Sequence, residues 1–112
     1  MYGLSNCDKV QAAKKWLKEN NIDFNFHDFK EKKPDKKMIS DWINKKGLEV
    51  LVNKKSTTYR NLADKTKDML LNEKTAVEVI ADNPSIIKRP VLIHKKNIII
   101  GFNNNEYSSL KT

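Results

Sequence analysis

Cys7 is the one cysteine in a chain of 112 residues. The short segment Met1–Leu4 is predicted as a strand, and a helix is predicted from about Cys7 to Asn20. A thiol at the start of a helix faces unpaired backbone N–H groups and the positive end of the helix dipole, which stabilise the nucleophilic thiolate. The alternative is a small buried hydrophobe. Because Cys7 lies outside the apolar stripe that runs from Val10 to Leu17, we expect a reactive thiol.

The chain contains two arginines, Arg60 and Arg89, and all of its other basic residues are lysines. A guanidinium group offers a planar fork of donors that binds oxyanions and carboxylates at two points, which lysine does not. Both arginines are therefore candidates for binding an anion. The alternative is that each lies in an ordinary surface ion pair.

Cys7 has no partner for an internal disulfide, since Val10 stands where a Cys-x-x-Cys motif would place its second cysteine. A sulfur that has formed an adduct must then be released by a thiol from outside the chain. The two histidines, His27 and His94, lack the spacing of a zinc site and are expected to be ordinary surface residues. We expect a monothiol mechanism, no metal and no tightly bound cofactor.

The elements around Cys7 predict a small mixed sheet. Alternating apolar residues over Ile22–Phe26 predict a second strand, parallel to the first because a helix separates them. The apolar runs Val91–Ile93 and Ile98–Ile100 predict a hairpin, with Pro90 directly before it. A short final helix is expected over Glu106–Leu110.

The middle of the chain, approximately residues 31–82, is predicted to be a helical insertion. Asp35 and Gly47 are expected to cap the two ends of one helix, and Asn72 to start another over Glu73–Asp82. Leu48–Val52 is predicted as a helical turn, Asn53–Asn61 as a loop, and Leu62–Leu71 as weakly helical. The expected fold is a single α/β domain over residues 1–112, with helices flanking the sheet.

The net charge of +8 raises the question of a nucleic-acid partner. Basic residues are spread along the chain and interleaved with acidic ones, so the charge is expected to be a solvated surface instead. There is no apolar run long enough to span a membrane and no signal-peptide pattern, and the lone cysteine suits a reducing compartment. We expect a cytoplasmic protein without membrane or nucleic-acid partners.

Six segments resemble the arsenate reductase ArsC/Spx family, and the resemblance covers nearly the whole chain. One of them is Ala12–Leu17. The other five, which carry the remaining motifs, are Tyr2–Asp8, Asn21–Asp28, Thr57–Leu62, Asn83–Leu92 and Ile100–Phe102. Within the family the likeness is to the YffB branch, whose members are described as glutathione-dependent thiol reductases. The resemblance implies a thioredoxin-like fold with a four-stranded mixed sheet.

The resemblance also implies roles for individual residues. Cys7 would be the nucleophile, Arg60 and Arg89 would bind the oxyanion, and Pro90 would be a cis proline facing the thiol. Arsenate reductases of the family carry a further arginine after the last strand, whereas Gly101–Asn104 contains none. The absence of this further arginine favours glutathione or a mixed disulfide over arsenate as the substrate.

The leading hypothesis is therefore a thiol reductase that uses glutathione as co-substrate, with glutathione or glutaredoxin releasing the adduct from Cys7. Asn6, Lys9 and Pro90 are expected to contribute to substrate binding, and Asn6 also to cap the helix that follows. One alternative is an arsenate reductase that uses the same thiols. Another is a Spx-like redox regulator that binds RNA polymerase, against which stands Val10, because such regulators rely on a Cys-x-x-Cys switch.

Overall fold

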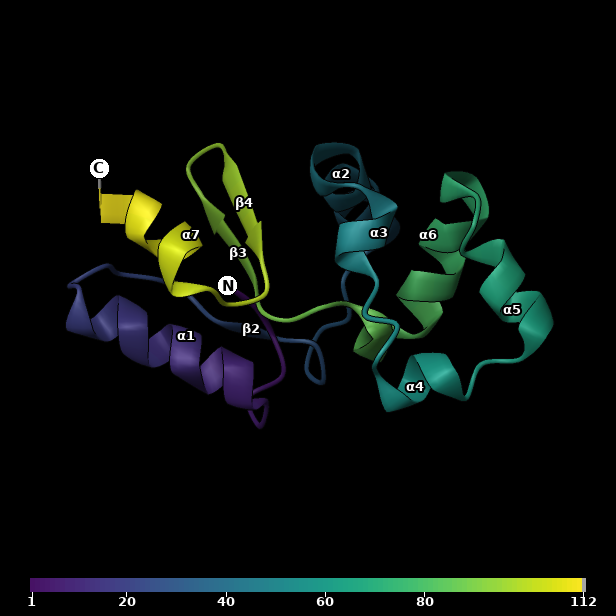
Figure 1. Cartoon of the computed structure of the whole chain (residues 1–112), viewed down its shortest axis with the longest axis horizontal. Helices are drawn as coiled ribbons and strands as arrows, with labels where there is room; N and C mark the ends of the chain where they lie inside the picture. The colour runs from purple at the N-terminus through teal and green to yellow at the C-terminus, as the bar shows by residue number, and fades with distance from the viewer. Residues whose placement is uncertain (112) are drawn as a thin grey trace. The chain divides into compact units, whose positions relative to one another are not determined.

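A computed structural model of the chain describes residues 1–111, which form two compact units. The sheet unit consists of Met1–Lys32 and the chain from Arg89 onward, and the helical unit is Lys33–Lys88 (Figure 1). The helical unit covers most of the segment predicted as an insertion, approximately residues 31–82, but it begins at Lys33 and continues beyond residue 82. The reason is a bridge between Val52 and Ile87, which ties the chain after the last long helix back to this unit.

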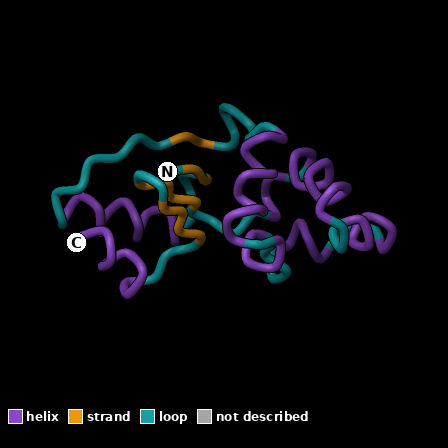
Figure 2. Tube along the Cα trace, turned by 90° about the horizontal axis from the view of Figure 1, so that it is seen from above, coloured by secondary structure: helices purple, strands orange, loops and turns teal. Residues whose placement is uncertain are grey.

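The sheet has four strands in the order β2-β1-β3-β4. Figure 2 draws the strands in orange. They are β1 (Tyr2–Gly3), β2 (His27–Asp28), β3 (Val91–His94) and β4 (Asn97–Ile100). β1 is parallel to β2 and antiparallel to β3, and β3 and β4 form the predicted hairpin. This is the mixed, thioredoxin-like sheet expected from the sequence.

The second strand begins later than predicted. The segment Ile22–Phe26 keeps its alternation, with Ile22, Phe24 and Phe26 half-buried against the core, but it lies outside the paired strand. β1 contributes only Tyr2 and Gly3 to the parallel pairing, and these residues pair with His27 and Asp28. Alternation identified the buried face correctly, whereas the pairing partner decided the register.

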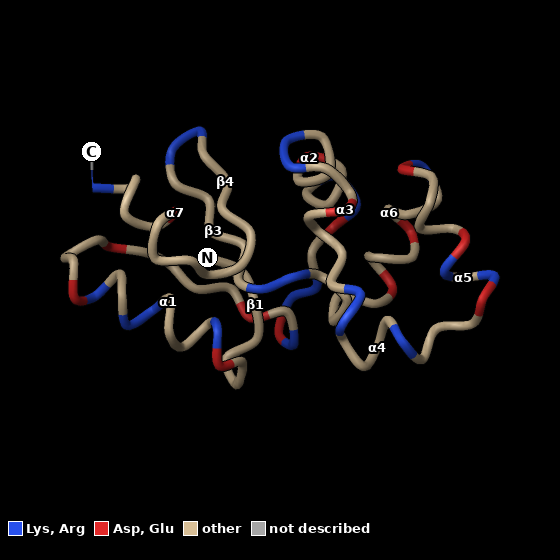
Figure 3. Tube along the Cα trace, in the orientation of Figure 1, with Lys and Arg blue, Asp and Glu red and all other residues tan. Residues whose placement is uncertain are grey.

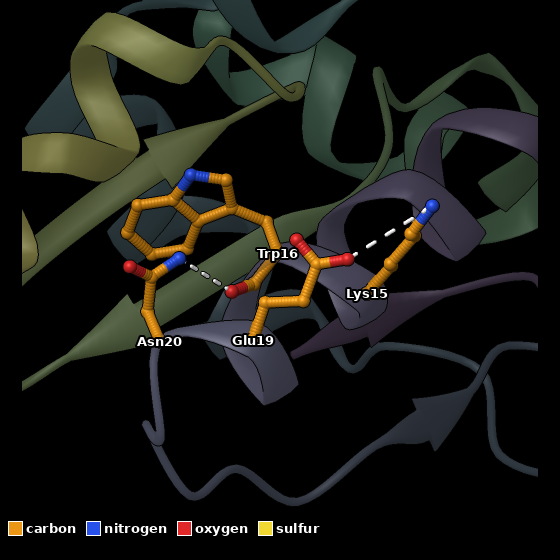
Figure 4. A network of polar contacts seen from close by, with 4 residues as sticks. All are labelled: Lys15, Trp16, Glu19 and Asn20. Atoms are coloured by element: carbon orange, nitrogen blue, oxygen red, sulfur yellow. Dashed lines mark hydrogen bonds and ion pairs between the residues drawn. The ribbon is translucent and has the colours of Figure 1, made fainter.

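Helix α1 (Asp8–Glu19) packs into the core of the sheet unit through Val10, Ala13 and Leu17, which are all fully buried. These side chains form one core cluster with residues of β3, β4 and the C-terminal helix α7 (Asn104–Ser108), which continues into η2 (Ser109–Lys111). At the end of α1, the Asn20 side chain donates to the Trp16 carbonyl at 2.8 Å (Figure 4). An exposed Lys15–Glu19 ion pair lies on the same turn at 3.9 Å.

The longest helices of the helical unit, α2 (Lys36–Lys46) and α6 (Glu73–Asp82), begin at the predicted caps. The Asp35 carboxylate accepts a hydrogen bond from the Met38 amide at 2.8 Å, and Asn72 accepts one from the Lys74 amide at 2.9 Å. α2 ends at Gly47, whose φ of +91° favours glycine. The predicted bounds of α6 are confirmed, and its buried residues are Ala76, Val79 and Ile80.

Three short helices and a 3-10 turn complete the helical unit: α3 (Leu48–Leu51), α4 (Thr57–Arg60), α5 (Asp64–Met69) and η1 (Pro84–Ile86). The prediction of a loop over Asn53–Asn61 is wrong in its second half. There the Ser56 hydroxyl accepts a hydrogen bond from the Tyr59 amide at 3.1 Å and starts α4. Among residues 1–111, no helix is both long and apolar enough to span a bilayer.

Candidate active site around Cys7

Cys7 lies between β1 and α1 and is the N-cap residue of the helix, with extended backbone angles of φ −89° and ψ 129°. Its amide donates to the Leu4 carbonyl at 3.1 Å, and its carbonyl accepts from the Gln11 amide at 3.0 Å. The side chain is half-buried and makes no capping hydrogen bond. The sulfur thus stands at the start of a helix of 12 residues.

The expectation that Asn6 caps α1 is wrong, because the cap position is occupied by Cys7 itself. Asn6 lies one residue earlier, exposed, in the turn that closes between Leu4 and Cys7. Lys9 is also exposed, as the second residue of α1. Both side chains flank the thiol in sequence and are free to meet a ligand from solvent, so their role in substrate binding stays a prediction.

Arg89 and Pro90 directly precede β3 and are joined by a cis peptide bond, as the resemblance implied. Because β1 and β3 are antiparallel, the end of β1 and the start of β3 lie at the same end of the sheet. Gly3 makes this approach close: a Cβ there would lie 3.8 Å from both Arg89 Cβ and Pro90 Cα. Pro90 is buried, and Arg89 is half-buried next to the strand that leads into Cys7.

Arg60 belongs to the helical unit, where it is the last residue of α4 and is exposed. Its carbonyl accepts a hydrogen bond from Lys67 Nζ at 3.4 Å, and the same ammonium lies 5.4 Å from the ring centroid of Tyr59. The contacts within this unit leave the guanidinium free to bind an anion from solvent. The predicted role of Arg60 beside Cys7 stays a prediction.

Two residues that the sequence did not single out hold the turn before Cys7. The Asp28 carboxylate, at the end of β2, accepts a hydrogen bond from the Ser5 amide at 3.3 Å. The Gln11 side-chain amide, from the first turns of α1, donates to the Ser5 carbonyl. Asp28 is the last residue of Asn21–Asp28, a segment that carries the family resemblance. It lies 21 residues from Cys7 in the sequence, so the contact becomes evident only from the pairing of β1 with β2.

The histidines lie elsewhere in the sheet unit. His27 stacks on Tyr2 with ring centroids 4.8 Å apart, and both histidines line a cavity of about 240 Å³ at the start of β1. Cys7 is not part of the lining of that cavity. Within the described chain, no three His, Cys, Asp or Glu side chains come together as a metal site.

Basic and acidic residues are interspersed along both units (Figure 3). Two exposed ion pairs, Lys15–Glu19 and Lys36–Glu78, join residues of opposite charge within the described part of the chain. Exposed pairs of this kind contribute little to stability. The charge pattern therefore adds no specific site to the one around Cys7.

Comparison with known proteins places this arrangement in a family. The family model described as the ArsC family matches residues 2–110. An uncharacterized protein of Haemophilus influenzae is 41% identical over 97% of this chain and 95% of its own length. The regulatory protein MgsR of Bacillus subtilis is 27% identical over 97% of this chain and 86% of its own length.

Solved structures agree with the sequence matches. A protein named YffB superposes with a TM-score of 0.92 at 33% identity, over 96% of this chain and 94% of the other. An arsenate reductase (ArsC) related protein from Brucella melitensis superposes with a TM-score of 0.74 at 31% identity, over 96% and 89%. The chain, with its cysteine at the start of α1 and its cis Arg89–Pro90 bond, belongs to the ArsC family.

Proposed function

We propose that this protein is a monothiol reductase that reduces mixed disulfides of glutathione through Cys7. The observation that carries the proposal is the position of Cys7: a half-buried thiol at the N-cap of α1, without a capping hydrogen bond of its own. Family membership supports thiol chemistry at this position. A glutathione-dependent reaction requires a reducing compartment, so we place the protein in the cytoplasm.

The proposed reaction consists of two thiol–disulfide exchanges. In the first, the Cys7 thiolate attacks the glutathione sulfur of a mixed disulfide, and the substrate leaves as a thiolate that takes a proton from water. In the second, a glutathione thiolate attacks the Cys7–glutathione disulfide, which releases oxidised glutathione and restores the Cys7 thiolate. Cys7 has no second cysteine to resolve the adduct internally, so the second exchange needs glutathione or glutaredoxin.

Arg89 is the proposed anion-binding residue of the sheet unit. Its backbone is held against β1 through the close approach to Gly3, and its guanidinium can bind a glutathione carboxylate at two points. Arg60, Lys9 and Asn6 are proposed as further contacts to the substrate, and Pro90 as the wall beside the thiol.

Arsenate is the weaker substrate candidate within this proposal. The turn after β4, Gly101–Asn104, offers glycine, aromatic and amide side chains but no arginine for a third contact to an oxyanion. A glutathione disulfide carries carboxylates, and a single guanidinium can bind a carboxylate at two points. We therefore expect arsenate turnover to be slow compared with the reduction of a mixed disulfide.

The test is reduction of a glutathionylated peptide by glutathione, with oxidised glutathione measured through NADPH and glutathione reductase. The wild-type protein should accelerate release of the peptide thiol, and Cys7→Ser should abolish the acceleration. Arg89→Lys and Arg60→Lys should raise the KM for the glutathionylated peptide, with Lys88→Ala and Lys65→Ala as controls at exposed lysines. Retention of full activity by Cys7→Ser would eliminate the proposal.

A second candidate function is redox-dependent regulation of transcription. It is favoured by the likeness to the regulatory protein MgsR and to the global transcriptional regulator Spx of Lactiplantibacillus plantarum, which is 26% identical over 95% of this chain. Against it, the position of the second switch cysteine is occupied by Val10, which is fully buried. Pull-down of RNA polymerase with reduced and oxidised protein separates the two functions. A reductase should bind no RNA polymerase in either redox state.

A further inference from the structure

We propose that Asp28 is a positioning residue for Cys7: its carboxylate holds the Ser5–Cys7 turn against the end of β2 so that the thiol stays at the start of α1. The proposal rests on the proposed function only in taking Cys7 as the reacting group. Gln11 acts with Asp28 from the helix side.

The first step of the argument is the turn itself. β1 ends at Gly3, and the chain turns through Ser5 and Asn6, closed by the hydrogen bond from the Cys7 amide to the Leu4 carbonyl. Ser5 and Asn6 are both exposed. Cys7 itself packs against the core of the sheet unit, so the polar contacts to this turn act together with that packing to set the position of the thiol.

Asp28 supplies one of these contacts from a different strand. Its pairing with Gly3 places it beside the end of β1, and the Phe29 amide donates to the Gly3 carbonyl at 2.8 Å. From there Asp28 Oδ2 accepts the Ser5 amide at 3.3 Å, while Oδ1 accepts the Lys30 amide at 2.9 Å. One carboxylate thus joins the turn before Cys7 to the turn after β2.

Gln11 supplies the second contact. Its backbone amide bonds the Cys7 carbonyl, and its side-chain amide donates to the Ser5 carbonyl. The peptide groups on both sides of Ser5 are therefore held, the N–H by Asp28 and the C=O by Gln11. Two contacts of opposite polarity on one residue fix the orientation of the turn better than either does alone.

The charge of Asp28 suits this role. Hydrogen bonds from the Lys30 amide and from Ser5 hold the pKa of the carboxyl below its ordinary value, with a further contribution from the Lys30 charge. The group is therefore ionised at neutral pH, and bonds from backbone N–H groups to a carboxylate are stronger than those to a neutral oxygen. The carboxylate charge is therefore stabilised by these backbone donors and by the Lys30 ammonium.

The test compares Asp28→Ala and Asp28→Asn with Asp23→Ala, which removes an exposed aspartate from the segment before the same strand. Gln11→Ala is compared with Lys18→Ala, an exposed position on the same helix. The readouts are the rate of Cys7 alkylation by iodoacetamide as a function of pH, and kcat and KM for the glutathionylated peptide. All are measured at a temperature where circular dichroism shows the variants fully folded.

We expect Asp28→Ala to lower kcat and the alkylation rate about fivefold or more, because small misplacements of a reacting group are costly. Asp28→Asn, which keeps one acceptor oxygen, should retain more of both rates than Asp28→Ala. Gln11→Ala should lower them less, and the two controls should stay within twofold of the wild type. KM should change little, since Asp28 does not contact the substrate.

A purely structural role for Asp28 would lower the melting temperature and leave the alkylation profile and kcat of the folded variant unchanged. That result would overturn the inference while the proposed function stood. If the wild-type protein reduced no disulfide, the proposed function would fall, and the alkylation profile of Cys7 would still decide whether Asp28 positions the thiol.

Discussion

Helix α1 of the sheet unit begins differently from α2 and α6, the long helices of the helical unit. The contrast is between these helices, because α7 of the sheet unit is capped by Asn103, whereas α3 and α5 of the helical unit have no side-chain cap. In the helical unit, α2, α4 and α6 each start at a residue whose side chain accepts a hydrogen bond from the first turn: Asp35, Ser56 and Asn72. In the sheet unit, α1 starts at Cys7, which makes no such bond. A good N-cap is worth about 1 kcal/mol to a helix. Helix α1 therefore lacks the stabilisation of a side-chain cap, and a thiol occupies its N-cap position instead.

The strongest test of this comparison is Cys7→Ser. Serine is a preferred N-cap, so we expect the free energy of unfolding to rise by about 0.5–1 kcal/mol, measured by urea denaturation. The same change should reduce disulfide reductase activity at least about a hundredfold, because a hydroxyl is a far weaker nucleophile than a thiolate. A variant that is both more stable and inactive would show that the cap position of α1 serves chemistry.

A second test concerns how each unit uses a glycine. A Cβ on Gly3 would lie 2.8 Å from Val10 Cγ2 in the core of the sheet unit, so Gly3→Ala should destabilise by about 2 kcal/mol. Gly47 in the helical unit has no atom within 4 Å of such a Cβ, and Gly47→Ala should cost about 1–2 kcal/mol through its positive φ alone.

The double variant with Val10→Ala separates the two causes. Removing the valine methyl groups should reduce the cost of Gly3→Ala, because the crowding atom is gone, and should leave the cost of Gly47→Ala unchanged. Urea denaturation of the single and double variants gives the coupling energies. Equal coupling of Val10 to both glycines would contradict the assignment.

A third test removes a cap from the helical unit. Asp35→Ala deletes the acceptor for the Met38 amide, and we expect a loss of about 1 kcal/mol in the free energy of unfolding. Asp41→Ala, at an exposed position within α2, is the matched control. The alkylation rate of Cys7 should be the same in both variants. A slower rate in Asp35→Ala would contradict the claim that the cap of α2 contributes to stability without affecting the reactivity of Cys7.

The smallest expected effect concerns Tyr107 in the core of the sheet unit. Its ring makes edge contacts with Trp16 and Phe102, at centroid distances of 5.5 and 4.8 Å, while its hydroxyl is buried and has no hydrogen-bond partner among residues 1–111. Burial and the charge of Glu106 raise the pKa of this hydroxyl. Tyr107→Phe keeps the ring contacts and should stabilise the protein by about 1 kcal/mol, because it removes an unsatisfied polar group. A loss of stability in thermal denaturation would point to a partner for the hydroxyl.

The elements predicted well from the sequence are those set by neighbours in the chain. The bounds of α6 follow from a cap at Asn72 and an Asn83–Pro84 stop, and the β3–β4 hairpin follows from two apolar runs around a short turn. The second strand was misplaced because its register depends on a partner 25 residues away, Tyr2 with His27. The one-turn helix α4 was missed because a four-residue segment carries too little periodicity to distinguish it from a loop.

By itself, the sequence determined that one cysteine stands between a strand and a helix and that arginine occurs at two positions, because residue identity and local periodicity suffice for both. Only the tertiary structure decided which groups surround Cys7 within the sheet unit. It brought cis Arg89–Pro90 against Gly3 and placed Asp28 across from Ser5. The physical reason is that these contacts arise from strand pairing between distant segments, for which the chain carries no local signal.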